Sequence, residues 1–279
     1  MRQVTSRHND TFKFLKALTE PTSRKKHRAF LLEGATFVAE ALAETPSLVR
    51  FVVLTPEVMP SERGQRIIAL AQQRAVPVVV MAPELFAELS ATATPQGVIA
   101  ALAQPEWANW QQRALPERCL VVVLESVQDP TNVGAIVRTA DAVGTFAVLY
   151  TKGTADPFAP KAVRASAGSV LHLPVLPIAS VSAVADWFKT HQGQLVATVP
   201  QNGVDCFEAA FADRVAIVVG NEARGVSAET LMLADLKVRV PMDGKARSLN
   251  AAVATGIVLY EWWRRQRQNS VGAALRHAP

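Results

Sequence analysis

The chain has few of the residues on which several common kinds of site depend. Its two cysteines, Cys119 and Cys206, lack CxxC spacing, and its five histidines form no group with ligand spacing, so we expect no metal and a reducing compartment. No two glycines are separated by a single residue, which argues against a GxGxxG dinucleotide loop. A phosphate-binding loop and a GxSxG elbow are missing as well, so an NTPase and a serine hydrolase have no support.

Long hydrophobic runs are also missing. No apolar run approaches the roughly 18 residues that a membrane-spanning helix needs. The N-terminus opens with Arg2 and Arg7 among polar residues, and no charged patch followed by an apolar stretch is present. We therefore expect neither a signal peptide nor a membrane span, and we expect a cytoplasmic protein.

Positive charge is concentrated at the start of the chain. The formal net charge is +5, yet the first 30 residues alone carry eight basic side chains against two acidic ones, so the rest of the chain is close to neutral. Such a segment favours contact with a polyanion, because each neutralised phosphate releases counterions. A solvated N-terminal arm explains the charge equally well.

Apolar runs alternate with helical stretches from about residue 29 onward, which predicts an α/β fold with largely parallel sheets. The predicted strands are Phe30–Glu33, Val49–Leu54, Val76–Val80, Val98–Leu102, Leu120–Leu124, Phe146–Tyr150, Leu195–Thr198, Val215–Val219 and Val238–Val240. The predicted helices include Ala35–Ala43, Arg63–Arg74, Val133–Val143, Ala183–Thr190 and Leu249–Arg267. A polar stretch with two prolines, residues 104–118, separates the two halves. We predict an N-terminal domain at 1–105, a linker at 106–117 and a C-terminal domain at 118–279.

Three segments of the C-terminal half combine a buried strand, a loop and polar side chains. In the first, residues 124–144, Asp129–Asn132 supplies a turn and cap, and Arg138 faces away from the apolar stripe of the helix. A purely structural interpretation is that Asn132 only caps this helix while Arg138 pairs with Asp141 on a solvated face.

The second segment, AIVVGNEARG at residues 216–225, ends a strand in a loop that holds Glu222 between two glycines. Ligands usually bind at such an edge of a parallel sheet, although a tight turn with a solvated Glu222 and Arg224 is the plainer interpretation. In the third segment, residues 238–261, Ser248 is typical of an N-cap for the following helix. Asn250, in an apolar first turn, is harder to explain by packing.

Together and in this order, the segments resemble the three signature motifs of the SpoU/TrmH family of RNA ribose 2′-O-methyltransferases. The matching stretches are DPTNVGAIVRTADAVG, VVGNEARG and VPMDGKARSLNAAVATGIVLYE. FLLEGATFVAEAL and PQGVIAAL resemble the N-terminal RNA-binding domain of the family, and ASAGSVLHLPV resembles a stretch between the first two motifs. The resemblance extends from about residue 5 to about residue 265.

The resemblance implies a C-terminal α/β domain tied in a deep trefoil knot, an exception to the usual topology, and a homodimer with its active site at the subunit interface. It implies S-adenosylmethionine (AdoMet) as cofactor, held mainly by main-chain groups around Thr198, Gly220, Val240 and Leu249. The implied catalytic residues are Arg138, Asn132, Glu222, Ser248 and Asn250. Since a guanidinium stays protonated in proteins, we expect Arg138 to orient and stabilise the attacking ribose oxygen instead of acting as a general base.

The implied substrate is ribosomal RNA of the large subunit, bound in part by the N-terminal domain through Arg24, Lys25, Lys26 and Arg28. Transfer RNA is the alternative substrate, and a non-catalytic RNA-binding or assembly factor that has kept the fold is the alternative function. The loop Lys245-Ala246-Arg247 is more basic than is common in the family. It either adds a phosphate contact or is a solvated loop.

Overall fold

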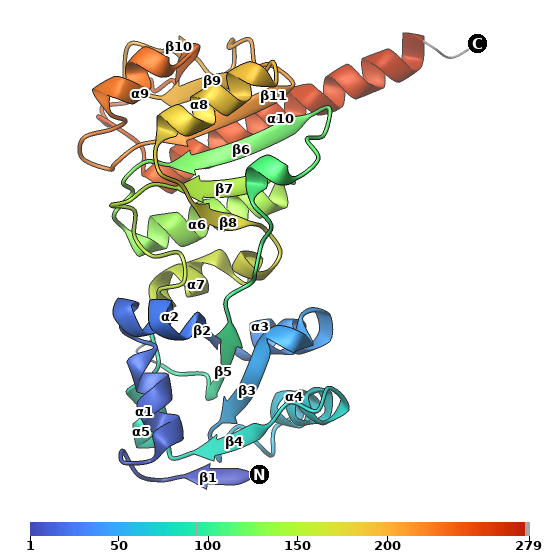
Figure 1. Ribbon diagram of the computed structural model, residues 1–279, viewed down its shortest axis with the longest axis vertical. Coiled ribbons are helices and arrows are strands. Elements are labelled where there is room, and N and C mark those ends of the chain that lie inside the picture. Colours follow the sequence, from blue (N-terminus) through green and yellow to red (C-terminus); the bar gives the residue numbers. More distant parts are fainter. Residues whose placement is uncertain (93, 277–279) are drawn as a thin grey trace. The chain divides into compact units, whose positions relative to one another are not determined.

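The computed structural model describes residues 1–92 and 94–276, so His277, one of the five histidines, lies outside the described residues. The chain forms two compact units (Figure 1). The first consists of Met1–Glu106 and Asp156–Leu171, and the second consists of Trp107–Ala155 and the chain from His172. The predicted C-terminal domain includes residues 156–171, whereas the structure places this segment in the first unit. The chain therefore passes between the units three times.

The first unit contains a mixed five-stranded sheet. Its strands are β1 (Arg2–Val4), β2 (Ala29–Glu33), β3 (Val49–Leu54), β4 (Val78–Met81) and β5 (Val98–Ala103), in the order β1-β4-β3-β5-β2. The first three in this order are mutually parallel, but β5 runs antiparallel to both β3 and β2. The prediction of a largely parallel sheet is thus wrong for this unit. β4 begins two residues later than predicted, because Pro77 has no N–H to donate to the sheet.

The helices of the first unit come from both of its segments. They are α1 (Asp10–Ala17), α2 (Pro21–His27), α3 (Ala35–Glu44), α4 (Glu62–Gln73), α5 (Pro83–Ala87) and α7 (Pro160–Ser166). α7 packs against β2. Next to it the ring of Phe158 lies 5.1 Å from that of the buried Phe30. The second segment therefore completes the hydrophobic core of the first unit.

The second unit contains a seven-stranded sheet in which every pairing is parallel, as predicted for this half. Its strands are β6 (Cys119–Leu124), β7 (Ala147–Tyr150), β8 (Val175–Pro177), β9 (Gln194–Thr198), β10 (Val204–Asp205), β11 (Arg214–Val219) and β12 (Leu236–Arg239), in the order β10-β12-β9-β11-β6-β7-β8. The sequence patterns missed β8 and β10. Both are too short to show a hydrophobic period.

The central strands β6 and β11 are buried almost throughout, which explains their continuous apolar runs, rich in valine. The main helices of this unit are α6 (Pro130–Ala142), α8 (Val181–Thr190), α9 (Ala228–Leu233) and α10 (Ala251–Arg276). α6 and α10 pack against each other. Among the described residues, no helix is long and apolar enough to cross a membrane.

The strand order changes direction beside β6. From β6 the chain adds β7 and β8 on one side, and then places β9, β11 and β12 on the other. In open parallel sheets, ligands bind outside the carboxyl ends of the strands at such a reversal. The loops after β6, β9, β11 and β12 all emerge at this edge, so the fold brings the three segments of interest together. The trefoil knot stays a prediction.

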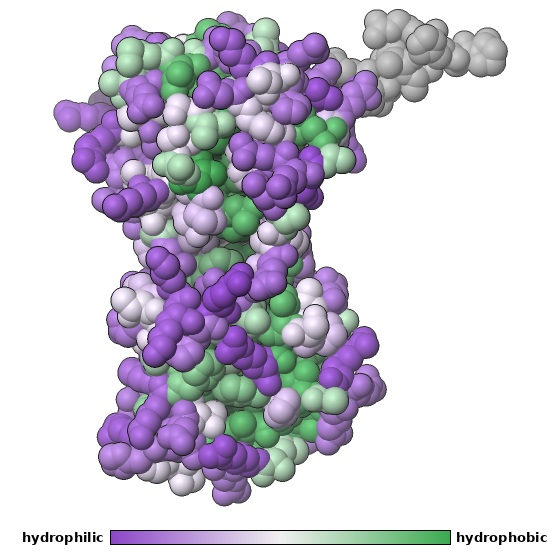
Figure 2. All heavy atoms as spheres, viewed as in Figure 1, coloured by the Kyte–Doolittle hydropathy of each residue, from purple (hydrophilic) through white to green (hydrophobic). Residues whose placement is uncertain are grey.

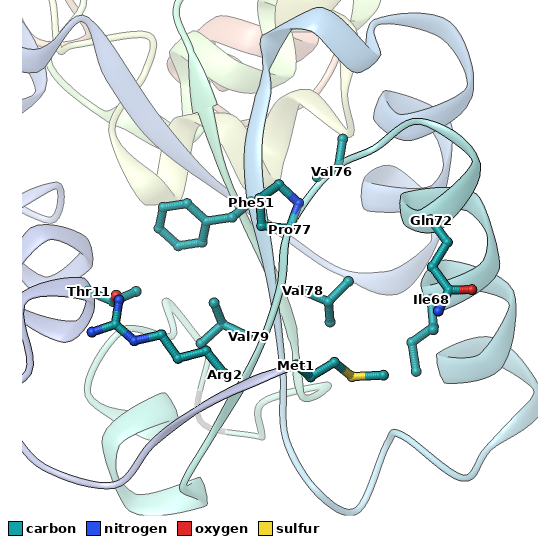
Figure 3. A pocket seen from close by; sticks show the side chains of 10 residues that line it. All are labelled: Met1, Arg2, Thr11, Phe51, Ile68, Gln72, Val76, Pro77, Val78 and Val79. Atoms are coloured by element: carbon teal, nitrogen blue, oxygen red, sulfur yellow. The ribbon is translucent and has the colours of Figure 1, made fainter.

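Hydrophilic side chains cover most of the visible face of each unit, and hydrophobic ones gather over β3 and β4 of the first unit (Figure 2). A cavity of about 540 Å³ lies in that region, lined by residues from β1, β3, β4, α1 and α4 (Figure 3). Its lining is mostly apolar, and Arg2 is its only charged side chain among the described residues. It offers no group suited to acid–base or transfer chemistry.

Candidate active site

A second cavity, of about 490 Å³, opens at the carboxyl edge of the parallel sheet. Eight of the nine predicted catalytic and cofactor residues line it: Asn132, Thr198, Gly220, Glu222, Val240, Ser248, Leu249 and Asn250. They come from the ends of β9, β11 and β12, from α6 and from the start of α10. The fold thus gathers residues from all three motifs around one space, whose volume is in the usual range of about 300–1,000 Å³ for small-molecule sites.

The Glu222 carboxylate joins the loop after β11 to the start of α6. Its Oε2 accepts a hydrogen bond from the backbone N–H of Gln128 at 3.0 Å. Its Oε1 accepts from the backbone N–H of Asp129 at 3.1 Å and from Nδ2 of Asn132 at 2.9 Å. Both oxygens therefore accept hydrogen bonds, so Glu222 is exposed, as the plainer interpretation has it, but is also held to the first motif.

These hydrogen bonds also shift the acidity of Glu222. Partial burial of the carboxylate favours its neutral form and opposes the shift. The donors from Gln128, Asn132, Asp129 and the backbone of Glu222 itself favour the charged form, and together they hold the pKa of Glu222 below its ordinary value. The residue is an anion that orders donors around it, and not a proton donor.

Asn250 extends this network to the third motif. Its Nδ2 donates to Oδ1 of Asn132 at 2.9 Å, while its own Oδ1 accepts from the backbone N–H of Ala252 at 2.9 Å and of Val253 at 3.2 Å. The last two bonds make Asn250 the N-cap of α10. The expectation that Ser248 caps this helix is therefore wrong. Ser248 instead lies in the preceding loop, exposed and on the cavity wall.

At the first motif, the cap also differs from the purely structural interpretation. Asp129 caps α6 by accepting from the backbone N–H of Thr131 at 2.8 Å. Asn132 therefore does not cap the helix; it is buried and hydrogen-bonded to both Glu222 and Asn250. One chain of hydrogen bonds, Glu222–Asn132–Asn250, thus connects all three motifs.

Asn221 is a site residue that the sequence patterns did not single out. Its Oδ1 accepts from the backbone N–H groups of Ala223 and Arg224 at 3.0 and 3.1 Å, and its Nδ2 donates to the Ser126 carbonyl at 2.9 Å. Its backbone also bonds to Gly225 in both directions. The side chain holds the loop closed, and its Asx-type turn beside a glycine is the sequence signal that points to this role.

Gly220 and Gly225 allow this loop to close. Gly225 has a φ of +70°, a left-handed conformation that favours glycine. A Cβ built on Gly220 would lie 2.2 Å from the backbone carbon of Gly225, a distance that no real contact shows. The backbone of the loop must therefore remain bare at Gly220, as expected of a cradle made from main-chain groups.

Glu125, the residue that follows β6, is a second residue that the sequence patterns missed. Its carboxylate accepts from the backbone N–H and Oγ of Ser227, at 2.9 and 2.7 Å, and from Oγ1 of Thr230 at 2.9 Å. Ser227 caps α9. Glu125 therefore fixes the far end of the loop that carries Glu222.

The remaining wall of the cavity fits a nucleoside-like cofactor. Val219, Val238, Val240, Leu249 and Val258 supply apolar surface for a flat ring. Leu249 is 37% exposed, unusually open for a leucine beside a buried sheet. Thr198 donates its hydroxyl to the Val218 carbonyl at 2.9 Å, so this side chain braces the wall. These residues fit AdoMet.

Arg138 is the predicted site residue that the cavity does not include. It lies exposed on α6, and within the described part of the chain its side chain has no hydrogen bond or ion pair. The alternative pairing with Asp141 is not seen, because Asp141 faces His172, with Oδ2 and Nδ1 3.6 Å apart.

The four predicted RNA-binding residues lie in different environments. Arg24 is only 2% exposed and pairs with Asp156, with Nε and Oδ2 2.7 Å apart, so the expectation of a surface position is wrong for this residue. Lys25 and Lys26 are exposed on α2, and Arg28 is exposed with an ion pair to Glu106 at 3.0 Å. RNA binding by these three side chains stays a prediction.

Two family models match this chain. A model described as the SpoU rRNA Methylase family matches residues 119–260, and one described as the MRM3-like substrate binding domain matches residues 9–100. The chain is 34% identical to the 23S rRNA (guanosine(2553)-2′-O)-methyltransferase RlmP of Bacillus subtilis, over 93% of this chain and 98% of that protein.

Solved structures give the same result. The chain is similar to an AdoMet-bound rRNA methyltransferase from Sinorhizobium meliloti, with a TM-score of 0.81 and 30% identity over 95% of this chain and 98% of that one. It is also similar to the SpoU methyltransferase AviRb from Streptomyces viridochromogenes in complex with AdoMet, with a TM-score of 0.79 and 30% identity over 93% and 98% of the two chains.

Proposed function

Because the chain belongs to the SpoU rRNA methylase family, we propose that it transfers the methyl group of AdoMet to a ribose 2′-hydroxyl of large-subunit ribosomal RNA. The observation that carries the proposal is the chain of hydrogen bonds from Glu222 through Asn132 to Asn250, beside a cavity that residues of the second and third motifs line. A protein that had kept only the fold for RNA binding would not need this network to be complete.

AdoMet, when bound, supplies a methyl group activated by a sulfonium. The task of the protein is to hold that methyl group in line with the ribose oxygen, and alignment of this kind is worth roughly 7–11 kcal/mol over the bimolecular reaction. The main chain around Thr198, Gly220, Val240 and Leu249 holds the cofactor. Asn132, Glu222, Ser248 and Asn250 fix the loops and the substrate at the mouth of the cavity.

Arg138 acts on the RNA and not on the cofactor. Its exposed guanidinium, free of partners within the described residues, orients the 2′-hydroxyl and the adjacent phosphate and stabilises the developing charge on the oxygen. Its place outside the cavity of one chain supports a site that a second subunit completes. We therefore also propose a knotted catalytic domain, a homodimer, and action in the cytoplasm.

The reaction and the substrate are tested together. The purified protein is incubated with labelled AdoMet and separate pools of ribosomal and transfer RNA, which are then digested and analysed by mass spectrometry. We expect label in a nuclease-resistant dinucleotide from the ribosomal pool. Label only in transfer RNA would overturn the substrate, and no transfer to either pool would overturn the activity.

The role of Arg138 is tested by Arg138→Ala. We expect methyl transfer to fall by about 100-fold or more while AdoMet affinity, measured by calorimetry, stays within about twofold, because the side chain acts on the RNA and on the developing charge but does not contact the cofactor. Equal losses of transfer and of cofactor affinity would contradict this assignment.

A further inference from the structure

Two arginines that the mechanism does not use line the cavity. Arg224 lies in the loop after β11, and Arg247 lies in the loop between β12 and α10. Both residues are exposed. Within the described residues, neither guanidinium has a hydrogen bond or an ion pair, and Arg224 donates to Oδ1 of Asn221 only through its backbone N–H.

The cavity wall holds a single carboxylate against these two guanidinium groups, and that carboxylate is bonded elsewhere. In the part of the chain that the structure describes, Glu222 is the only acidic residue that lines the cavity. Both of its oxygens already accept hydrogen bonds from the first motif, at 2.9 to 3.1 Å. The described lining of the cavity, with two arginines and one glutamate, therefore has a net formal charge of +1, and neither guanidinium is paired with that carboxylate.

The cofactor does not supply the missing negative charge. AdoMet carries a sulfonium and an ammonium group against a single carboxylate, so its net charge is positive, and two nearby guanidinium groups are unfavourable for it. A ligand that carries several negatively charged oxygens would instead be attracted by the two guanidinium groups. The planar guanidinium matches a phosphate with two parallel hydrogen bonds, which a lysine cannot do.

We propose, on the basis of the proposed function, that Arg224 and Arg247 form a clamp for the RNA backbone beside the target ribose. Each binds a phosphate oxygen from one side of the cavity mouth. The clamp positions the RNA strand and does not read its bases. It also gives a role to the basic loop at residues 245–247, which the family motif alone leaves unexplained.

The double variant Arg224→Gln/Arg247→Gln tests the clamp. Lys189→Gln/Lys237→Gln is the matched control, since it removes the same charge from exposed positions of the same unit that do not line the cavity. Three quantities are measured for both variants and the wild type: AdoMet affinity by calorimetry, affinity for protein-free large-subunit rRNA by filter binding at several salt concentrations, and methyl transfer.

We expect the double variant to bind the rRNA about tenfold more weakly than the control does, with a salt dependence of log K that is shallower by about 0.7–0.9 for each lost phosphate contact. We expect AdoMet affinity to change less than about twofold. Equal RNA affinities and salt slopes for the two variants would overturn the clamp. A loss of AdoMet affinity in the double variant, without a change in RNA binding, would also overturn it and assign the arginines to the cofactor carboxylate. Failure of the wild type to methylate any RNA would overturn the proposed function instead, and the comparison of RNA binding would still decide the clamp.

Discussion

At the residue scale, the Glu222 carboxylate accepts hydrogen bonds from two backbone N–H groups, which cannot rotate away as side chains can. Replacement by glutamine keeps the shape but brings an NH₂ group against the N–H of Gln128, or against the donors from Asp129 and Asn132, so that at least one donor loses its acceptor. The effect of this residue on stability must therefore depend on its charge.

This dependence predicts how the stability gap between wild type and Glu222→Gln varies with pH. The pKa of Glu222 is lowered in the folded protein from 4.5, so its contribution is fully present above pH 4.5 and is lost as the pH falls through the lower folded value. We expect the difference in melting temperature to be larger at about pH 7 than at about pH 4. A gap that widens on acidification would contradict the assigned shift.

The space beside Gly220 is filled by backbone atoms of Gly225 and Val226, which cannot move aside as a flexible side chain could. We expect Gly220→Ala to lower AdoMet affinity by more than about tenfold, because the added Cβ meets the main chain of Gly225 and must move the loop. Calorimetry measures the loss. Gly256→Ala in α10 is the control, since its Cβ would make an ordinary contact of 3.6 Å with the side chain of Thr139 on α6. A similar loss of AdoMet affinity in this control would refute the argument.

At the scale of the element, α10 begins with a residue that serves both the helix and the site. We expect Asn250→Ala to lower the free energy of unfolding by about 1 kcal/mol, the usual cost of a lost N-cap, and to reduce methyl transfer because Asn132 loses a partner. Ser248→Ala should reduce transfer but leave stability unchanged. Urea unfolding of both variants measures their free energies of unfolding. Equal destabilisation of the two variants would contradict the assignment of the N-cap to Asn250.

The N-cap of α10 is a feature that sequence patterns alone could not predict correctly. Serine and asparagine are equally good N-caps, and only the geometry of the loop decides which side chain reaches the first backbone N–H groups. The strands β6 and β11 were predictable because burial on both faces leaves an unbroken apolar run. The antiparallel position of β5 was not, since hydrophobic runs carry no information on strand direction.

The grouping of the motif residues in space was predictable for a different reason. Their motif pattern marked Asn132, Glu222 and Asn250, and the structure joins all three. The pairing of Arg24 with Asp156, 132 positions away, leaves no local trace in either segment. A cluster of basic residues at 24–28 therefore suggested a surface patch, although one of its members is an internal ion-pair partner.

At the scale of the whole molecule, this pair ties the two segments of the first unit together. Asp156→Ala leaves the buried guanidinium of Arg24 without a countercharge, with only the carbonyls of Leu18 and Thr19 as partners. We expect a loss of about 3 kcal/mol, the lower end for a broken buried pair because Asp156 is itself partly exposed.

Hydrogen exchange locates that loss. Faster exchange is expected in α2 and β2 and little change in the parallel sheet of the second unit. Asp186→Ala, at an exposed position on α8, is the control. Exchange that rises equally in both units after Asp156→Ala would mean that the pair does not act locally.

The return of residues 156–171 to the first unit has a consequence for engineering. A chimera that exchanges only residues 1–106 for those of a relative would set a foreign β2 against the native α7, and a foreign residue 24 against Asp156. Transplanting substrate recognition between such enzymes therefore requires grafting two stretches at once, and sequence divergence in either stretch is constrained by the other.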